Sequence, residues 1–177
     1  QWGKSFPYIF QSFGEYKYPT HIYATAIFIK FFGLSNFIVR LPSALMGIIN
    51  IFLLFFLVRK LTESNNFIAL SAALFLSISP WHIQFSRINW ETNFTLFFFF
   101  SGLISFLSFT IKPRLLPLSF FLFGLSLYTY NAAKIFIPIF VAFLSILYIK
   151  ELRKNKKNLL FALSIFQFPV RCIHSFI

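Results

Sequence analysis

Long apolar stretches separated by short polar connections constrain this chain more than any other feature. The stretch Thr92–Ile111 alone contains seven phenylalanines and no charged residue. A bilayer core needs about 20 mostly apolar residues per helix. Backbone polar groups in lipid must pair within the segment, so each such stretch predicts an α-helix. We therefore expect an all-α fold, a polytopic transmembrane helix bundle.

Five stretches are predicted to be complete spans, and a sixth begins near Leu159 and is cut short. The five are Phe37–Val58, Phe67–Ile83, Thr92–Ile111, Leu115–Tyr130 and Ile135–Ile149. The predicted organisation is an extracytoplasmic segment over 1–36, a transmembrane domain over 37–158, and a truncated span with a tail over 159–177. We expect the chain to be a piece of a longer protein at both ends.

The composition excludes several other classes of protein. Hydrophobic residues make up 58% of the chain and charged residues 11%, against about 45–50% and about 25% in soluble domains. That much apolar surface excludes both a soluble globule and a disordered chain. A single cysteine, Cys172, excludes a disulfide scaffold.

The formal charge of +12 is interpreted first as a topology signal. The cations stand between apolar runs rather than on one polar face, so we expect no nucleic-acid partner. Nine of them fall on the same predicted side, which should be cytoplasmic. They are Arg59, Lys60, Lys112, Arg114, Lys150, Arg153, Lys154, Lys156 and Lys157. The outer loops are then Pro80–Glu91 and Thr129–Lys134. Their cations Arg87 and Lys134 lie outside, where the positive-inside rule predicts few cations.

The segment before the first span contains no clean span of its own. Tyr18–Phe32 is apolar but short, and it carries His21 and Lys30. A short aromatic helix with a cation is typical of one that lies in the membrane interface. Gly33 should end it.

Polar residues gather in four clusters, and each also has an ordinary structural explanation. Phe13–Pro19 pairs a carboxylate with an amine, or is a polar loop with interfacial aromatics. Leu127–Lys134 is a polar outer turn, or tyrosines at the interface. Phe37–Ala44 is interpreted as a helix start at which Arg40 extends towards head groups.

The remaining cluster, Ser79–Asn93, is the most unusual, because it packs many polar residues into one short outer turn. Glu91 is either a carboxylate that favours the positive end of the next helix or an acid at a membrane-level cavity, with Arg87 available for a phosphate.

In register, these clusters resemble membrane glycosyltransferases of the protein O-mannosyltransferase and aminoarabinose-transferase type, which use polyprenyl-phosphate sugars. The stretches that carry the resemblance are Trp2–Pro7, Ser12–Lys17, Phe32–Ala44, Pro80–Asn93 and Leu127–Tyr130. The resemblance runs from Trp2 to about Lys157 and implies the C-type fold of these enzymes.

The resemblance also implies roles for individual residues. Lys17 stands where a family lysine faces the donor phosphate, and Glu15 stands where family acids take part in binding a divalent cation. Glu91 is the catalytic candidate, while the family's main acid is expected upstream of Gln1. Two sets of further candidates complete the predicted site. The phosphate set is Lys17, Arg87 and Lys134, and the substrate-cavity set is Tyr16, His82, Asn93 and Tyr130.

The predicted function is transfer of a hexosyl or pentosyl unit from a polyprenyl-phosphate donor to an acceptor, which is a protein, a lipid or a glycan. It should take place at the extracytoplasmic face of the plasma (inner) membrane. Apart from a divalent cation at Glu15, the resemblance implies no cofactor. The chain alone should lack the general base. The alternatives are a segment of a transporter or flippase and a purely structural membrane subunit.

Overall fold

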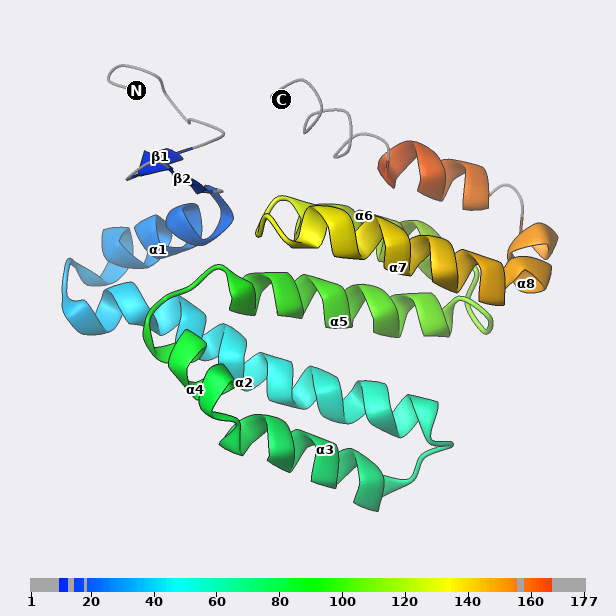
Figure 1. The fold of residues 1–177 in the computed structure, drawn as a ribbon, viewed down its shortest axis with the longest axis horizontal. Helices are drawn as coiled ribbons and strands as arrows, with labels where there is room; N and C mark the ends of the chain where they lie inside the picture. The colour runs from blue at the N-terminus through cyan, green and yellow to red at the C-terminus, as the bar shows by residue number, and fades with distance from the viewer. Residues whose placement is uncertain (1–9, 13–14, 18, 156–157, 167–177) are drawn as a thin grey trace.

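The computed structural model describes residues 10–12, 15–17, 19–155 and 158–166, and most of them are helical (Figure 1). A short hairpin of strands β1 and β2 precedes helices α1 to α8, and residues 158–166 are helical again. The bounds are β1 Phe10–Ser12, β2 Glu15–Lys17, α1 Pro19–Phe32, α2 Asn36–Leu61, α3 Asn66–Ile78, α4 Pro80–Arg87, α5 Thr92–Ser108, α6 Leu115–Leu127, α7 Ala133–Leu147 and α8 Ile149–Lys154.

The predicted helical fold is confirmed, with one difference before α1. There the sequence predicted an irregular loop, but β1 and β2 pair antiparallel, with Phe10 opposite Lys17 and Ser12 opposite Glu15. The pairing lets two three-residue strands satisfy backbone groups that a loop would leave to water.

The first predicted span and the interfacial segment both form helices at the expected places. The side chain of Ser35 caps α2 by accepting a hydrogen bond from the Ile38 N–H at 3.3 Å. In this role a serine oxygen satisfies one of the unpaired donors at the helix start. Gly33 has a φ of +81° and its N–H donates to the Ile29 carbonyl, so it ends α1 as predicted.

The second predicted span, Phe67–Ile83, is not one straight helix. Helix α3 ends at Ile78, and α4 continues at a bend of 57°. Pro80 has no N–H to donate to the preceding turn, but it suits the first position of a new helix. The predicted outer loop Pro80–Glu91 is therefore mostly a helix.

By length and apolar composition, one described helix, α2, can cross a membrane, and the bent pair α3–α4 is a second candidate. Helices α5, α6 and α7 are apolar but have 17, 13 and 15 residues. At 1.5 Å per residue, α5 is about 25 Å long and the other two are shorter.

Phenylalanine fills the contact between α5, α6 and α7. Phe106, Phe120 and Phe123 are buried there, and Phe99 packs against Phe140 with ring centroids 5.1 Å apart. Tilted aromatic pairs at such distances are favourable beyond their buried area. Other phenylalanines are exposed on the outer helix faces, as in Phe67 and Phe75.

The predicted grouping of the connections is visible at the two ends of the bundle. The α2–α3 turn, the α5–α6 connection and α8 lie at one end, whereas α1, α4 and the α6–α7 turn lie at the other (Figure 1). Lys60 at the end of α2 donates to the Ser108 hydroxyl at the end of α5. The described members of the nine-cation group therefore share one end. Below, the other is called the outer end.

At Gly47, α2 and α4 approach each other closely. A Cβ at this position would overlap the Ser86 side chain. We expect Gly47→Ala to lower the free energy of unfolding by about 1–3 kcal/mol, because overpacking forces the two helices apart. Thermal unfolding of the detergent-solubilised full-length protein measures this. Adding Ser86→Ala should recover part of the loss, since it removes the hydroxyl that the new methyl meets. Two losses that simply add would contradict this explanation.

Candidate functional site

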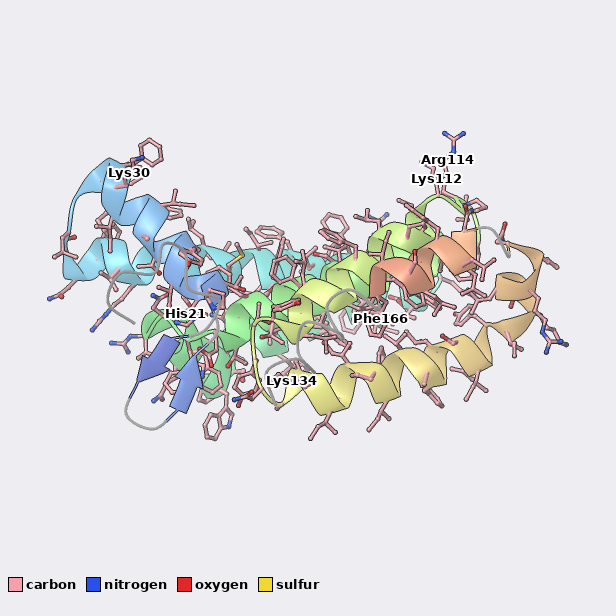
Figure 2. All side chains as sticks on the ribbon, turned by 90° about the horizontal axis from the view of Figure 1, so that it is seen from above. His21, Lys30, Lys112, Arg114, Lys134 and Phe166 are labelled. Carbon is pink, nitrogen blue, oxygen red and sulfur yellow. The ribbon has the colours of Figure 1, made fainter. Side chains whose placement is uncertain are left out.

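The outer end of the bundle brings four separate parts of the chain together. They are the first turns of α1, helix α4, the start of α5 and the α6–α7 turn (Figure 1). His21 and Lys134 lie at this end, and Lys112 and Arg114 lie at the opposite end (Figure 2). Most of the predicted site residues fall in these four parts.

Asn93 fastens three helices together beneath this outer end. Its Nδ2 lies 3.0 Å from the Ser86 hydroxyl on α4, and 3.1 and 3.2 Å from the hydroxyl and carbonyl oxygens of Ser43 on α2. The Asn93 carbonyl accepts a 2.9 Å hydrogen bond from Asn50 Nδ2. Asn93 is 2% exposed. It therefore lies inside the helix packing, and not along an open cavity as the sequence suggested.

His82 supports the same junction one turn before Ser86, on the same face of α4. Its Nε2 lies 3.1 Å from the Gly47 carbonyl on α2. A carbonyl only accepts, so Nε2 carries the hydrogen. The Ser86 hydroxyl donates to the His82 carbonyl at 2.8 Å, and the Ser43 hydroxyl donates to the Phe85 carbonyl at 3.1 Å. The His82–Gly47 and Ser43–Phe85 contacts thus join α4 directly to α2.

A groove of about 380 Å³ runs between α2, the end of α3 and α4. Arg40 from the first turns of α2 and Arg87 from the last turn of α4 both line it, together with His82. Aliphatic side chains line much of the rest, namely Ala44, Ile48, Ile51 and Ile83. Two guanidinium groups beside an apolar surface are suited to an amphiphile with an anionic head.

Arg40 had been interpreted as structural from the sequence. The groove brings it together with Arg87, which lies 47 positions further along the chain. No carboxylate among the described residues pairs with either arginine. The sequence signal was present, because both cations lie on the side that the positive-inside rule leaves poor in cations.

Glu91 contacts a residue that sequence reasoning did not select. Its Oε2 lies 3.5 Å from His21 Nδ1 on α1, and both side chains are largely buried. Glu91 occupies the N-cap position of α5, but its side chain makes no capping hydrogen bond there. Between Arg87 and Glu91 the chain leaves the helix, and Asn89 has a φ of +55°. Arg87 and Glu91 therefore do not lie on one continuous helix.

Helix α1 is attached to the outer end by two further contacts. Asn89 Nδ2 donates to the Thr25 hydroxyl at 2.9 Å, and the Thr20 hydroxyl donates to the Tyr128 carbonyl at 3.3 Å. The same Thr25 hydroxyl donates to the His21 carbonyl at 2.8 Å. These bonds hold the His21 side of α1 over the start of α5 and the α6–α7 turn.

Tyr130 lines a second groove, of about 340 Å³, between the first turns of α5 and α7. Its other lining residues include Thr92, Phe99 and Phe136. Lys134 is the second residue of α7 and lies at the same outer end (Figure 2). The predicted cavity residues His82 and Tyr130 therefore line two different grooves, one on each side of the α5 start.

The remaining predicted residues, Glu15, Tyr16 and Lys17, form strand β2, which is separated from α1 by one residue. Their side chains lie outside the described part of the structure, so their proposed contacts with phosphate or metal stay predictions. Within the described residues, no group of three or more His, Cys, Asp or Glu side chains is placed to hold a metal ion.

Comparison with known families gives one match, over residues 17–173, to the dolichyl-phosphate-mannose-protein mannosyltransferase family. The chain belongs to this family. No curated protein and no solved structure is significantly similar to it. The family consists of integral membrane glycosyltransferases with a lipid-linked sugar donor.

The mannosyltransferase match covers β2 from Lys17 and every helix of the structure. Both grooves, the Asn93 junction and the His21–Glu91 pair therefore lie within the matched region. The resemblance inferred from the sequence is confirmed at the level of the family.

We expect Asn93→Ala to lower the free energy of unfolding by about 1–3 kcal/mol, because it removes the donor that joins α5 to α2 and α4. Asn93→Asp should cost at least as much, since a carboxylate cannot donate to the same oxygens. Thermal unfolding of the detergent-solubilised full-length protein tests both variants. A tolerated aspartate would contradict the donor role of this amide.

Proposed function

We propose that the chain is part of an integral-membrane glycosyltransferase that moves a sugar from a polyprenyl-phosphate donor to an acceptor. Transfer takes place at the extracytoplasmic face of the plasma (inner) membrane. The observation that carries this proposal, beside the family membership, is the groove that combines Arg40 and Arg87 with aliphatic side chains at the outer end.

The chemistry of such a donor matches that groove. A polyprenyl phosphate has an apolar tail that stays in the bilayer and an anionic phosphate at the interface. Guanidinium groups bind phosphate oxygens through charge-assisted hydrogen bonds. As the bond between sugar and phosphate breaks, negative charge grows on the leaving phosphate, and fixed cations stabilise it. We assign Arg87 and Arg40 to the donor phosphate, with Lys17 and Lys134 as further candidates.

The proposed membrane arrangement follows from the two ends of the bundle. Helix α2, the α3–α4 pair, α5, α6 and α7 are the five proposed spans, and 158–166 begins a sixth. The nine-cation end is cytoplasmic by the positive-inside rule. Helix α1 then lies in the outer interface, where its exposed Phe31 and Phe32 reach the lipid.

The acceptor side of the reaction requires a proton acceptor. Glu91 is the candidate, because a carboxylate can deprotonate an acceptor hydroxyl. The upstream acid implied by the resemblance remains part of the proposal, and so does Glu15 as a candidate ligand of a divalent cation. For this reason every activity test uses the full-length parent protein.

The direct test is transfer by the purified full-length parent, supplied with polyprenyl-phosphate sugars and acceptor membranes. Sugar transfer, together with binding of the donor, supports the proposal. A parent that neither binds nor uses any of these donors contradicts it. Flux of the lipid across proteoliposomes without transfer would favour the transporter or flippase alternative.

We expect Arg87→Gln and Arg40→Gln each to raise the KM for the lipid-linked donor about tenfold or more, because each removes one charge-assisted contact worth about 1.5–3 kcal/mol. The matched control is Arg114→Gln at the opposite end, which should leave the KM unchanged. Initial rates against donor concentration measure the effect. An equal change in all three variants would contradict the groove assignment.

A further inference from the structure

The end of the bundle opposite the outer end, here called the cationic end, carries most of the described cations. Of the nine cations grouped at this end by the sequence, seven belong to the described residues, and all seven are exposed. They come from three elements, namely the end of α2, the α5–α6 connection and α8 (Figure 1). The seven are Arg59, Lys60, Lys112, Arg114, Lys150, Arg153 and Lys154.

Acidic side chains do not neutralise the cationic end. Within the described residues, the acids there are Glu63 in the turn after α2 and Glu151 in α8. Glu151 stands three residues before Lys154, a spacing that lets opposite charges pair on a helix. Neither acid forms an ion pair with any of the seven described cations. The positive charge of this end is therefore available to a partner outside the chain.

Helix electrostatics explains only part of the cluster. Arg59 and Lys60 lie in the last turn of α2, where the helix dipole favours cations. Arg114 instead occupies the N-cap position of α6, and Lys112 stands two residues before it (Figure 2). The positive end of a helix dipole disfavours cations and favours anions. An anion bound between the two cations would suit both of them and the start of α6.

Hydrogen bonds join the three cationic elements to one another. Lys60 at the end of α2 donates to the Ser108 hydroxyl, directly before the α5–α6 connection. Asn158, which begins the helical residues that follow α8, donates through Nδ2 to the Pro113 carbonyl at 3.2 Å. Pro113 is the residue between the two cations of the connection. The cations therefore belong to one connected surface.

Aromatic packing supports this surface from below. Tyr148, between α7 and α8, packs edge-on against Phe106 and Phe109, with ring centroids 5.5 and 6.2 Å apart. Leu152 of α8 is buried. Helix α8 is thus fixed beside the end of α5. A topology signal needs positive charge in each connection, but it does not need a common rigid support.

Each of the three elements also exposes an aliphatic side chain next to one of its cations in the sequence. They are Leu61 at the end of α2, Ile111 in the α5–α6 connection and Ile149 in α8, which are 57%, 78% and 44% exposed. A nucleic acid or an acidic peptide in solution would leave these side chains in water. A phospholipid suits both kinds of group, because its acyl chains cover the aliphatic side chains while its phosphate meets the cations.

We propose, given the membrane arrangement proposed above, that the cationic end is a binding surface for anionic phospholipids of the cytoplasmic leaflet. Lipid phosphates bind the cations of the α5–α6 connection and of α8, and the acyl chains lie against Ile111 and Ile149. Basic residues beside a membrane are attracted to anionic lipids in this way. This lipid is not consumed, and it is separate from the sugar donor at the groove of Arg40 and Arg87.

The test adds phosphatidylglycerol to the full-length parent protein in a neutral detergent and follows the unfolding temperature. A ligand that binds only the folded state raises this temperature. Phosphatidylglycerol should reach half of its effect at an about tenfold lower fraction of the micelle than phosphatidylcholine with the same chains. Raising the salt from about 0.1 M to about 1 M should weaken its binding, because the charges are then screened. Inorganic phosphate alone should have no effect, since it cannot cover the aliphatic side chains.

The double variant Lys112→Gln/Arg114→Gln should bind phosphatidylglycerol about 25-fold more weakly, since each cation near an anionic surface contributes about fivefold. The matched control Lys112→Arg/Arg114→Lys keeps both charges and should bind within about twofold of the parent. Lys30→Gln removes an exposed cation of α1 at the outer end and should also bind like the parent. The donor KM of the double variant in the same detergent should stay within about twofold of the parent value.

A photoreactive phosphatidylglycerol locates the lipid on the unaltered parent, so this measurement does not depend on the folding of a variant. Its cross-links should map to the α5–α6 connection and α8, and an excess of ordinary phosphatidylglycerol should abolish them. Cross-links confined to the groove of Arg40 and Arg87 would overturn the inference, because the anionic lipid would then occupy the proposed donor groove.

Three results of the titration would also overturn it. They are equal stabilisation by phosphatidylcholine, parent-like binding by Lys112→Gln/Arg114→Gln, and an equal loss of binding in Lys30→Gln. Stabilisation by inorganic phosphate alone would replace the lipid by a soluble anion and so contradict the proposal. All of these are binding measurements that do not require sugar transfer. A parent that binds phosphatidylglycerol but transfers no sugar contradicts only the proposed function, so the two failures are distinguishable.

Discussion

The outer end of this protein depends on the amide of Asn93. An amide N–H group inside apolar helices must find acceptors, and here it finds them on two other helices at once. That requirement fixes α4 against α2 at the close approach of Gly47, and fixes the start of α5 beneath both. The same junction places Arg87 at the end of α4 and Glu91 before α5. A buried polar contact thus sets the positions of the charged groups at the outer end.

The sequence could predict the helices because bilayer physics leaves few alternatives to a long apolar run. The sequence-based prediction missed features that depend on only a few residues. A proline inside the run ended α3 at Ile78 and turned the expected loop into α4, while the apolar pattern continued past it. The pairing of β1 with β2 depends on backbone partners, which hydropathy does not report.

For the site, the sequence predicted polar residues but not their partners. Arg87, His82 and Glu91 were selected because they are strongly polar in a very apolar chain. Arg40 was assigned to helix structure, since the beginning of α2 explains it locally; only the fold brings it to the groove of Arg87. His21 stood in an apolar stretch with nothing nearby to suggest a role. Its partner lies 70 positions away, so the pair is a tertiary feature.

The scarcity of acids explains why the cations at the outer end have few possible partners within the chain. The chain has sixteen cations and four glutamates, and no aspartate. Cations at the outer end oppose the orientation that the nine-cation end favours, so Arg40 and Arg87 weaken the topology signal. Glu91 stands four residues from Arg87, but its side chain contacts the imidazole of His21. The two arginines therefore remain beside the groove without a carboxylate among the described residues. That arrangement makes sense when the anion comes from the membrane, as the phosphate of a lipid.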